Sequence, residues 1–334
     1  MRESLLPLLR CPRCAADGSF ALRAAESDAR EVREGELTCA RCGLAAAVER
    51  GVAHLMPDPP EVVRREAAGL ERFAELMRAD GWDRERVLRL PDEPSDYWGG
   101  QRRGIDHVLA TVPFRAGQTL LDVGSNTCWA SNVFARRGLR VVALDIATTE
   151  MQGLHTADWW FDADPEVHFE RVLGTMAAPP VASQSIDYVF CSEVLHHNRK
   201  PELQATLREL HRVLRPGGLL IVTGEPLRFP TNLKRDHGDE VAEFEGNENV
   251  YFFHEYVLAA RRAGFAIRLM EPRTPAFTGE PLWLTADSGA LGSAKVMAQH
   301  LLRRSVPGRR ALLAYTLLLG PDAPLGMLCR KPST

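Results

Sequence analysis

The fold is decided by the stretch Leu120-Leu121-Asp122-Val123-Gly124-Ser125-Asn126, an apolar run that ends in an acidic residue and a glycine turn. A second apolar run follows at residues 141–144 and ends in Asp145. Buried parallel strands read as continuous Val, Ile and Leu, and ligands bind where such strands end. Between the two runs, residues 128–137 read as a helix that closes at Gly138. The stretch therefore predicts a βαβ nucleotide-binding unit with two carboxylates at one rim of a sheet.

The sequence of the glycine turn indicates which kind of cofactor the site would bind. A dinucleotide site uses G-x-G-x-x-G so that backbone N–H groups can take a pyrophosphate. Here the second glycine position holds Asn126 and the third holds Cys128. Asn enters the left-handed region more readily than other non-glycine residues, so the turn is retained, but close approach of a pyrophosphate is less well supported. A cofactor with an amino-acid end and no phosphate fits better, and NAD or another nucleotide is the alternative.

Further runs continue the α/β pattern in a defined order. Residues 185–191 predict a strand. An amphipathic helix is predicted after it, with Pro201 near its first turn and apolar residues at helical spacing at Leu203, Leu207, Leu210 and Val213. The sequence Leu214-Arg215-Pro216-Gly217-Gly218 then precedes a strand at 219–223. With these motifs in this order, the chain resembles the class I S-adenosylmethionine-dependent methyltransferases over about residues 95–272, and again at 325–332. The resemblance implies an α/β fold with a Rossmann-like, seven-stranded methyltransferase sheet.

The resemblance also implies a cofactor site at the ends of these strands. Asp122 and residues 124–127 would enclose the methionine end, and Asp145 would accept hydrogen bonds from both ribose hydroxyls. Trp98 would cover the adenosyl group and Arg102 would meet the carboxylate, unless this segment is aromatic core with solvated arginines. The cofactor-binding residues expected are Trp98, Arg102, Asp122, Gly124, Ser125, Asn126, Thr127, Asp145, Ile146, Thr175, Met176, Glu193 and His196.

Candidate catalytic residues follow from the chemistry of methyl transfer. Displacement at a sulfonium needs alignment and exclusion of water, and a hydroxyl acceptor also needs a base, for which His is suited near neutral pH. His197, after the fourth strand, and His237, in the loop after the fifth, are the first choices. A nearby group of hard ligands would suit Mg²⁺, although its spacing is irregular: Glu225, Asp236, His237, Asp239 and Glu240.

Cysteines are concentrated near the N-terminus. Cys11, Cys14, Cys39 and Cys42 form two C-x-x-C pairs, which suit a tetrahedral structural zinc site. Two disulfides would fit poorly with a chain that shows no export signal, and a redox motif would need a βαβ context. Together with residues 8–12 and 48–56, the segment is similar to the small zinc-ribbon proteins that act as activating subunits of RNA and protein methyltransferases. The sequence does not choose between support of the enzyme and binding of substrate.

Length and composition set the domain organisation. A chain of 334 residues is expected to form two domains, a zinc ribbon at 1–58 and a methyltransferase domain at 59–334, with insertions at about 225–250 and 273–320. The absence of a convincing signal peptide and of an apolar run near ~20 residues predicts a cytoplasmic protein. Arginine pairs at 303–304 and 309–310 flank an apolar helix and permit membrane-surface or homodimer contacts.

The leading functional hypothesis is O-methylation of a small molecule, such as a natural product, or of a glycan. The net charge of −3 gives no bulk attraction for polyanions. RNA methylation is the first alternative, with the ribbon positioning the nucleic acid, but residues 1–58 hold eight Arg, no Lys and nine Asp plus Glu, a net of −1. A non-catalytic, cofactor-binding partner protein is the second alternative. N- or C-methylation also remains open.

Overall fold

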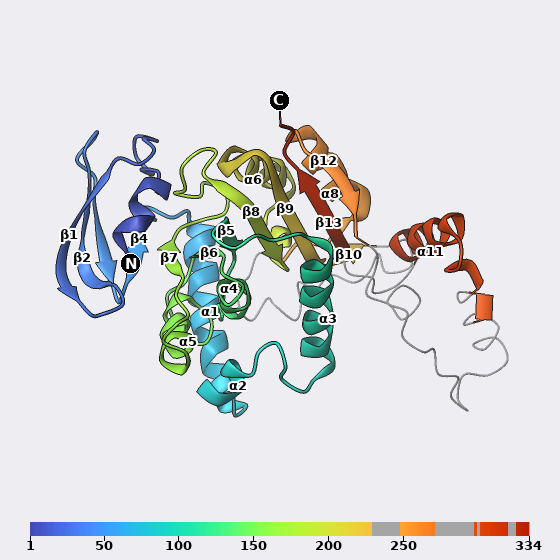
Figure 1. Cartoon of the computed structure of the whole chain (residues 1–334), viewed down its shortest axis with the longest axis horizontal. Coiled ribbons are helices and arrows are strands. Elements are labelled where there is room, and N and C mark those ends of the chain that lie inside the picture. The colour runs from blue at the N-terminus through green and yellow to red at the C-terminus, as the bar shows by residue number, and fades with distance from the viewer. Residues whose placement is uncertain (229–247, 271–296, 299–300, 320–324, 334) are drawn as a thin grey trace.

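The computed structural model of the chain describes residues 1–228, 248–270, 297–298, 301–319 and 325–333. In these residues one continuous mixed sheet has the order β1-β2-β3-β4-β7-β6-β5-β8-β9-β13-β12 (Figure 1). Its strands are β1 (Phe20–Ser27), β2 (Val32–Cys39), β3 (Ala45–Glu49), β4 (Val52–His54), β5 (Thr119–Val123), β6 (Arg140–Asp145), β7 (Glu170–Leu173), β8 (Ile186–Ser192), β9 (Leu214–Glu225), β12 (Ala266–Leu269) and β13 (Leu325–Arg330). A separate parallel pair joins β10 (Leu227–Arg228) to β11 (Tyr251–Phe252).

Helices cover both faces of this sheet. The α-helices are α1 (Glu61–Ala79), α2 (Arg84–Leu88), α3 (Asp96–Thr111), α4 (Trp129–Ala135), α5 (Ala157–Ala163), α6 (Lys200–Val213), α8 (Phe253–Arg262) and α11 (Val306–Leu319). Short 3₁₀ turns lie at η1 (Glu3–Leu8), η2 (Leu154–Thr156) and η3 (Leu195–His197). Residues of α6 and α8 pack in one hydrophobic core, and residues of α1 to α5 pack in the other.

The central strands show why the deciding stretch is continuously apolar. β5 pairs in parallel with both β6 and β8, so it has no free edge. Leu120 contributes to one core and Leu121 to the other, because successive side chains of a strand point to opposite faces. Both leucines have no exposed surface. The strands from β7 to β12 give the Rossmann-like methyltransferase sheet that the sequence predicted.

The N-terminal strands extend this sheet rather than standing apart from it. β4 pairs in parallel with β7, with Val52 opposite Arg171 and His54 opposite Leu173. β1, β2, β3 and β4 follow as antiparallel neighbours, and Figure 1 places them at one end of the molecule. The sequence pattern did not indicate this junction, since β4 contains three residues. The domain boundary expected at residue 58 stays a prediction.

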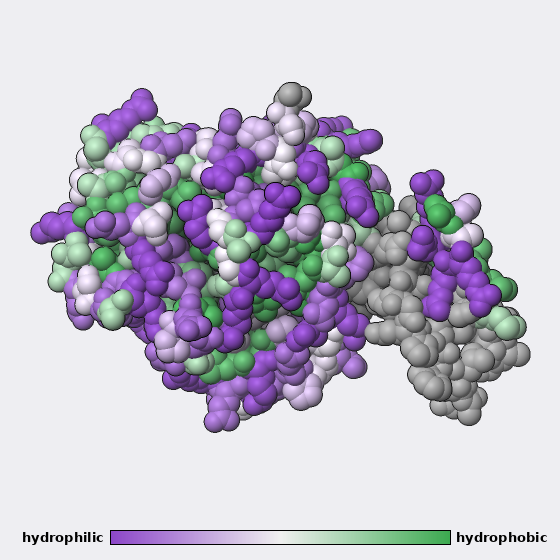
Figure 2. Space-filling view, viewed as in Figure 1, coloured by the Kyte–Doolittle hydropathy of each residue, from purple (hydrophilic) through white to green (hydrophobic). Residues whose placement is uncertain are grey.

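The two expected insertions lie largely outside the described residues. α11 is the main described element of the second insertion, and Figure 1 shows it away from the sheet. Of the helices that the structure describes, none has both the length and the hydrophobicity to cross a bilayer. On the face drawn in Figure 2, hydrophilic residues cover most of the surface and hydrophobic ones are scattered among them.

Candidate active site

A cavity of about 640 Å³ lies at the carboxyl ends of β5, β6, β7 and β8. Its floor is formed by the residues that follow these strands, including 122–127, 144–146 and 174–177. Residues of α1 and α3 line it as well. This position is where open α/β sheets bind ligands, and the volume is in the range of small-molecule sites.

The turn after β5 is held in an unusual backbone conformation. Gly124, Asn126 and Cys128 all have positive φ, at 66°, 46° and 58°. The Asn126 side chain accepts a hydrogen bond from the Thr127 N–H at 2.7 Å and donates one to Gln152 at 2.7 Å. These bonds hold a non-glycine residue in the left-handed region, as its place in the turn requires. The turn therefore forms with Asn126 and Cys128 at the two positions where the dinucleotide motif has glycine.

Asp122 and Asp145 lie side by side below this turn, at the ends of β5 and β6. Asp145 accepts hydrogen bonds from the backbone N–H groups of Asn126, at 2.8 Å, and Ala147, at 3.0 Å. Asp122 accepts one from the Ser131 hydroxyl at 2.6 Å. Burial raises the pKa of Asp122 to about 7 and that of Asp145 to about 6. A cation bound beside them would favour their charged forms.

The lining of the cavity is strongly acidic. Among the described lining residues, Arg199 is the single arginine and no lysine is present, and Arg199 pairs with Glu202. A positively charged ligand is therefore favoured, and a pyrophosphate is disfavoured. The carboxylates that line the cavity are Glu66, Asp122, Asp145, Glu193, Glu202 and Glu248.

α3 lines another side of the cavity and is joined to Glu193 by hydrogen bonds. The Tyr97 hydroxyl donates to Glu193 at 2.7 Å, and Gln101 Nε2 donates to its other oxygen at 2.6 Å. Trp98 also lines the cavity and packs edge to face against Trp129, with the two ring centroids 6.0 Å apart. The predicted aromatic cover is therefore at the cavity, although it belongs to a regular helix.

Arg102, on the same helix, lies elsewhere. It pairs with Asp92 at 2.6 Å and with Asp106 at 3.0 Å and does not line the cavity. Arg102 is about one turn from Trp98, but its guanidinium is engaged by two exposed carboxylates outside the cavity lining. The structure thus does not bring Arg102 to the predicted cofactor site. The other predicted cofactor residues, from Trp98 to His196, all line the cavity.

Two adjacent histidines lie at the mouth of the cavity, in η3. His196 is buried, with Nδ1 3.0 Å from Glu225 and Nε2 3.0 Å from Glu248. Burial alone would lower the pKa of His196, but these two carboxylates raise it to about 10. His197 has Nδ1 3.0 Å from Glu66 and Nε2 3.8 Å from Glu248. His196 is therefore protonated at neutral pH and unsuited to act as a base.

The proposed Mg²⁺ group cannot be assembled from the described residues. His237 and the acidic residues 236, 239 and 240 lie outside the part of the chain that the structure describes. Glu225 is fully buried, and its carboxylate accepts hydrogen bonds from the N–H groups of Val194, Leu195 and His196. Glu225 therefore holds η3 in place.

Sequence reasoning missed the contribution of α1. Its apolar stripe includes Val63, Leu70 and Phe73, which line the cavity together with Glu66. Phe73 is 36% exposed, which is large for an aromatic residue on the inner face of a helix. The carboxylate of Glu66 within that stripe was the available signal, because a charged residue is unusual on a packing face.

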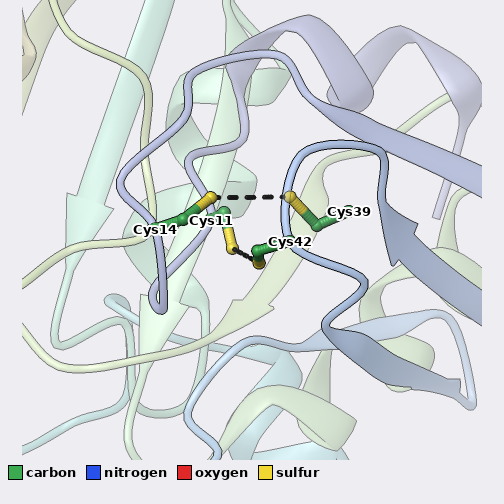
Figure 3. Close-up of side chains that lie close together, drawn as sticks. All are labelled: Cys11, Cys14, Cys39 and Cys42. Carbon is green, nitrogen blue, oxygen red and sulfur yellow. Dashed lines mark hydrogen bonds between the residues drawn. The ribbon is translucent and has the colours of Figure 1, made fainter.

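The four N-terminal cysteines converge on one point (Figure 3). Cys11 Sγ lies 3.6 Å from Cys42 Sγ, and Cys14 Sγ lies 3.7 Å from Cys39 Sγ. Disulfide sulfurs would be ~2.05 Å apart. Four sulfurs placed tetrahedrally at ~2.3 Å from a zinc ion are ~3.8 Å from one another. The residues therefore fit zinc and not a pair of disulfides.

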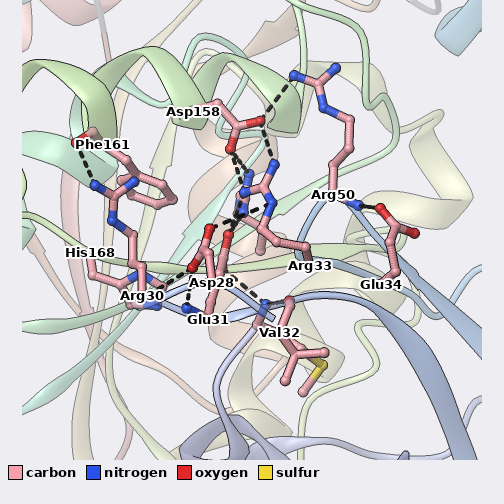
Figure 4. Close-up of polar contacts among 12 residues, drawn as sticks. Asp28, Arg30, Glu31, Val32, Arg33, Glu34, Arg50, Asp158, Phe161 and His168 are labelled. Carbon is pink, nitrogen blue, oxygen red and sulfur yellow. Dashed lines mark hydrogen bonds and ion pairs between the residues drawn. The ribbon is translucent and has the colours of Figure 1, made fainter. Parts of the chain in front are cut away.

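A buried ionic cluster joins the N-terminal strands to β7 and α5 (Figure 4). Arg171 has no exposed surface and contacts Glu31 and, at 2.8 Å, Asp158. Arg33 binds both oxygens of Asp158 at 3.0 Å, and Arg50 adds a contact to the same carboxylate at 3.0 Å. Burial would raise the pKa of Asp158, but the hydrogen bonds from Arg33 and the charge of Arg171 hold it well below its usual range.

Comparison with known proteins agrees with this geometry. Residues 121–222 match the family described as "Methyltransferase domain". Over 252 residues the chain is 27% identical to the 27-O-demethylrifamycin SV methyltransferase of Amycolatopsis mediterranei (strain S699), covering 73% of this chain and 87% of that protein. The chain is an S-adenosylmethionine-dependent methyltransferase.

Other relatives of this methyltransferase match over less of their length. It is 35% identical over 267 residues to the biotin biosynthesis bifunctional protein BioHC of Cellvibrio japonicus (strain Ueda107). That match covers 75% of this chain and 48% of the other protein, so the chain spans about half of that relative. Among solved structures, the YcgJ protein of Bacillus subtilis is 15% identical with a TM-score of 0.47, over 70% of this chain and 99% of that one.

Proposed function

We propose that this methyltransferase transfers the methyl group of S-adenosylmethionine to a hydroxyl oxygen of a small molecule, of the natural-product type rather than a glycan. Support comes from a relative of which the chain covers 87%, the 27-O-demethylrifamycin SV methyltransferase. A malonyl-[acyl-carrier protein] O-methyltransferase of Enterobacter lignolyticus (strain SCF1) is also 32% identical, over 126 residues. The first name refers to a rifamycin that lacks a methyl group on an oxygen, and the second specifies an O-methyltransferase.

The observation that carries the proposal is the charge of the cavity. Asp122 and Asp145 lie beneath it, and the other carboxylates of its lining outnumber the cations among the described residues. S-adenosylmethionine carries a sulfonium and an ammonium, so it gains from this lining, whereas NAD and an RNA backbone would bring phosphates against it. The charge therefore favours a sulfonium nucleoside and a neutral acceptor.

The residues of the turn can be given roles in binding. Asp145 uses one lone pair of each oxygen on a backbone N–H, which leaves acceptor capacity for the two ribose hydroxyls. Asp122 and residues 124–127 would hold the amino-acid end, and Ile146 would pack on the adenine. Trp98 would cover the adenosyl group from α3. Thr175 and Met176, after β7, would complete the adenine side.

Methyl transfer then needs alignment and removal of one proton. Bound S-adenosylmethionine supplies the methyl group: the acceptor oxygen forms a C–O bond while the C–S bond breaks, its electron pair stays on sulfur, and the hydroxyl proton is released. The chain contributes the walls that align the acceptor and exclude water. His197, half-buried in the cavity lining beside Glu66 and Glu248, is placed to assist loss of the proton.

We further propose that Cys11, Cys14, Cys39 and Cys42 bind a structural zinc ion, and that this ribbon supports the enzyme. The sulfur distances fit tetrahedral zinc with no open position. The ribbon strands end on β7, the strand before Thr175 and Met176, so an ordered ribbon would stiffen that side of the cavity. Its net charge of −1 over residues 1–58 does not favour RNA.

Calorimetry with S-adenosylhomocysteine and with NAD⁺ tests the cofactor. We expect binding of the former, and we expect Asp145→Ala to weaken it by about tenfold or more through lost charged hydrogen bonds. Asp162→Ala, at an exposed carboxylate, is the matched control and should leave the affinity unchanged. Binding of NAD⁺ in place of S-adenosylhomocysteine would show the proposal to be wrong.

The acceptor is tested with methyl-labelled S-adenosylmethionine. The full chain is incubated in parallel with a panel of phenols and aliphatic alcohols, with total RNA and with oligosaccharides. We expect label in a small-molecule ether that withstands mild base, since a methyl ester would be hydrolysed. Label retained in RNA would instead support nucleic-acid methylation.

A further inference from the structure

His196, His197 and Glu248 form a compact group of ligand-type side chains at the mouth of the cavity. One ligand atom of each lies within 4.8 Å of those of the other two. All three residues line the cavity, next to Glu193. They come from two segments, η3 after β8 and the residues before β11, so their meeting is a product of the fold.

Each imidazole has a carboxylate behind it. His196 Nδ1 lies 3.0 Å from Glu225, which is itself fixed by three backbone N–H groups of the same turn. His197 Nδ1 lies 3.0 Å from Glu66 on α1, an ion-pair contact that lacks the geometry of a hydrogen bond. A carboxylate hydrogen-bonded to Nδ1, as at His196, fixes the orientation of the ring and makes Nε2 a stronger ligand, which is the usual arrangement at protein metal sites.

The other ring nitrogens converge on Glu248. His196 Nε2 is 3.0 Å from one Glu248 oxygen, and His197 Nε2 is 3.8 Å from the other. Two atoms that each lie ~2.1 Å from one ion are ~3.0 Å apart at a right angle and ~3.4 Å apart at the tetrahedral angle. The observed separations bracket these values, so an ion would need only small side-chain movements.

The net charge of the group is negative, which favours binding of a cation. Three carboxylates, Glu66, Glu225 and Glu248, contact two imidazoles, so the group is negative even with both rings protonated. The nearest arginine of the cavity lining, Arg199, is engaged with Glu202. A divalent ion carries the same charge as the two extra ring protons together, so it could replace them without changing the net charge of the group.

We propose that His196, His197 and Glu248 bind a divalent transition-metal ion, with Glu225 and Glu66 as outer carboxylates. Two imidazoles and one carboxylate suit Mn²⁺, Fe²⁺, Co²⁺ or Zn²⁺ better than Mg²⁺, which prefers oxygen ligands. Three protein ligands leave coordination positions open toward the cavity. This site is distinct from the Mg²⁺ group that the sequence indicated, and from the four cysteines.

The role of the ion rests on the proposed O-methylation, whereas its binding does not. An acceptor hydroxyl held at an open position would have a lowered pKa and a fixed orientation. His197 would then assist loss of the proton as a ligand rather than as a free base. This predicts acceptors with two neighbouring oxygens, such as catechols or hydroxy-ketones, because they can occupy two positions at once.

Metal binding is measured directly on the full chain by electron paramagnetic resonance of Mn²⁺, after EDTA treatment and reloading with one equivalent of Zn²⁺. Thiolates favour Zn²⁺ over Mn²⁺, so the cysteines do not compete for the probe. We expect one Mn²⁺ per chain, lost in Glu248→Gln and in His196→Gln. Glu66→Gln should weaken binding by about 10- to 100-fold, as outer-carboxylate substitutions do.

Glu71→Gln is the matched control, because Glu71 is an exposed carboxylate on α1, the helix of Glu66, and does not line the cavity; this variant should bind Mn²⁺ as the unsubstituted chain does. Circular dichroism and S-adenosylhomocysteine affinity, measured on each variant, identify any that fail to fold. No stoichiometric Mn²⁺, or binding that survives Glu248→Gln in a folded protein, would overturn the metal site. If the metal site fails this test while S-adenosylhomocysteine still binds, the proposed methyltransferase function stands. If the unsubstituted chain binds Mn²⁺ but not S-adenosylhomocysteine, only the proposed methyltransferase function is contradicted.

Discussion

Gly124 is the residue at which the cofactor turn depends most on the absence of a side chain. Its φ is +66°, and a Cβ built on it would lie 2.4 Å from Cγ2 of Val194. Val194 belongs to the loop that Glu225 holds through its backbone, so it has little freedom to move away. Both the backbone and the neighbouring loop therefore require glycine here.

Gly124→Ala is expected to lower the affinity for S-adenosylhomocysteine by about tenfold or more and to destabilise the fold by about 2 kcal/mol, from left-handed strain plus the clash. Gly117→Ala separates the two causes, because Gly117 has φ +80° with no atom within 4 Å of a built Cβ. It should cost about 1 kcal/mol and leave the affinity unchanged. Calorimetry and urea unfolding measure both variants; equal affinities would show that the clash has no effect on the site.

At the scale of elements, the junction of β4 with β7 depends on a buried guanidinium. Arg171 lies at one end of this junction, opposite Val52, and its partners come from the β1–β2 connection and from α5. Buried ion pairs add little net stability over an apolar alternative, but removal of one partner leaves the remaining charges without compensation. The cluster therefore fixes which edge of the sheet the N-terminal strands occupy.

Arg171→Met is expected to reduce the free energy of unfolding by about 3–5 kcal/mol, since Glu31 and Asp158 would keep their charges in a buried place. Arg23→Met is the matched control on β1, where the side chain is 82% exposed and its pair with Glu36 is 3.7 Å long. That change should stay within about 0.5 kcal/mol. Urea unfolding followed by circular dichroism measures both. A small effect at Arg171 would mean that β4 is held mainly by its backbone hydrogen bonds.

At the scale of the whole molecule, one sheet runs from the strands of the cysteine ribbon at one edge to β12 at the other. The ribbon cannot lose its order without exposing β7 as an edge, because β4 covers that strand. β7 in turn leads to Gly174, Thr175 and Met176 in the cavity lining. Order in the ribbon and order in the cofactor site are therefore expected to be coupled.

Removal of zinc with a strong chelator should lower the unfolding temperature of the whole chain by about 5 °C or more, because structural zinc contributes directly to folding. Differential scanning calorimetry should show a single transition that moves, and re-addition of Zn²⁺ should restore it. Two transitions, with the upper one unchanged by the chelator, would contradict the coupling and would favour two independent domains.

The sequence predicted the parts of the fold that local patterns determine. The continuous apolar runs indicated β5, β6 and β8, and the spacing of Leu203, Leu207 and Leu210 indicated α6, since strand and helix periods can be read from neighbours along the chain. The cysteine pairs likewise indicated their convergence. The predicted cofactor set lines the cavity except Arg102, because motif order gives the ends of strands but not the direction of a surface arginine.

The tertiary structure alone decided what depends on contacts between distant segments. The joining of the ribbon to β7, the placement of α1 over the cavity, and the meeting of His196 and His197 with Glu66 and Glu248 have no local signature. Residues 66 and 197 are brought together by packing across the sheet, and such pairs follow from the summed burial of many side chains. Periodicity determines which residues form an element and which face is apolar, whereas the identity of the facing partner is fixed only when the elements pack.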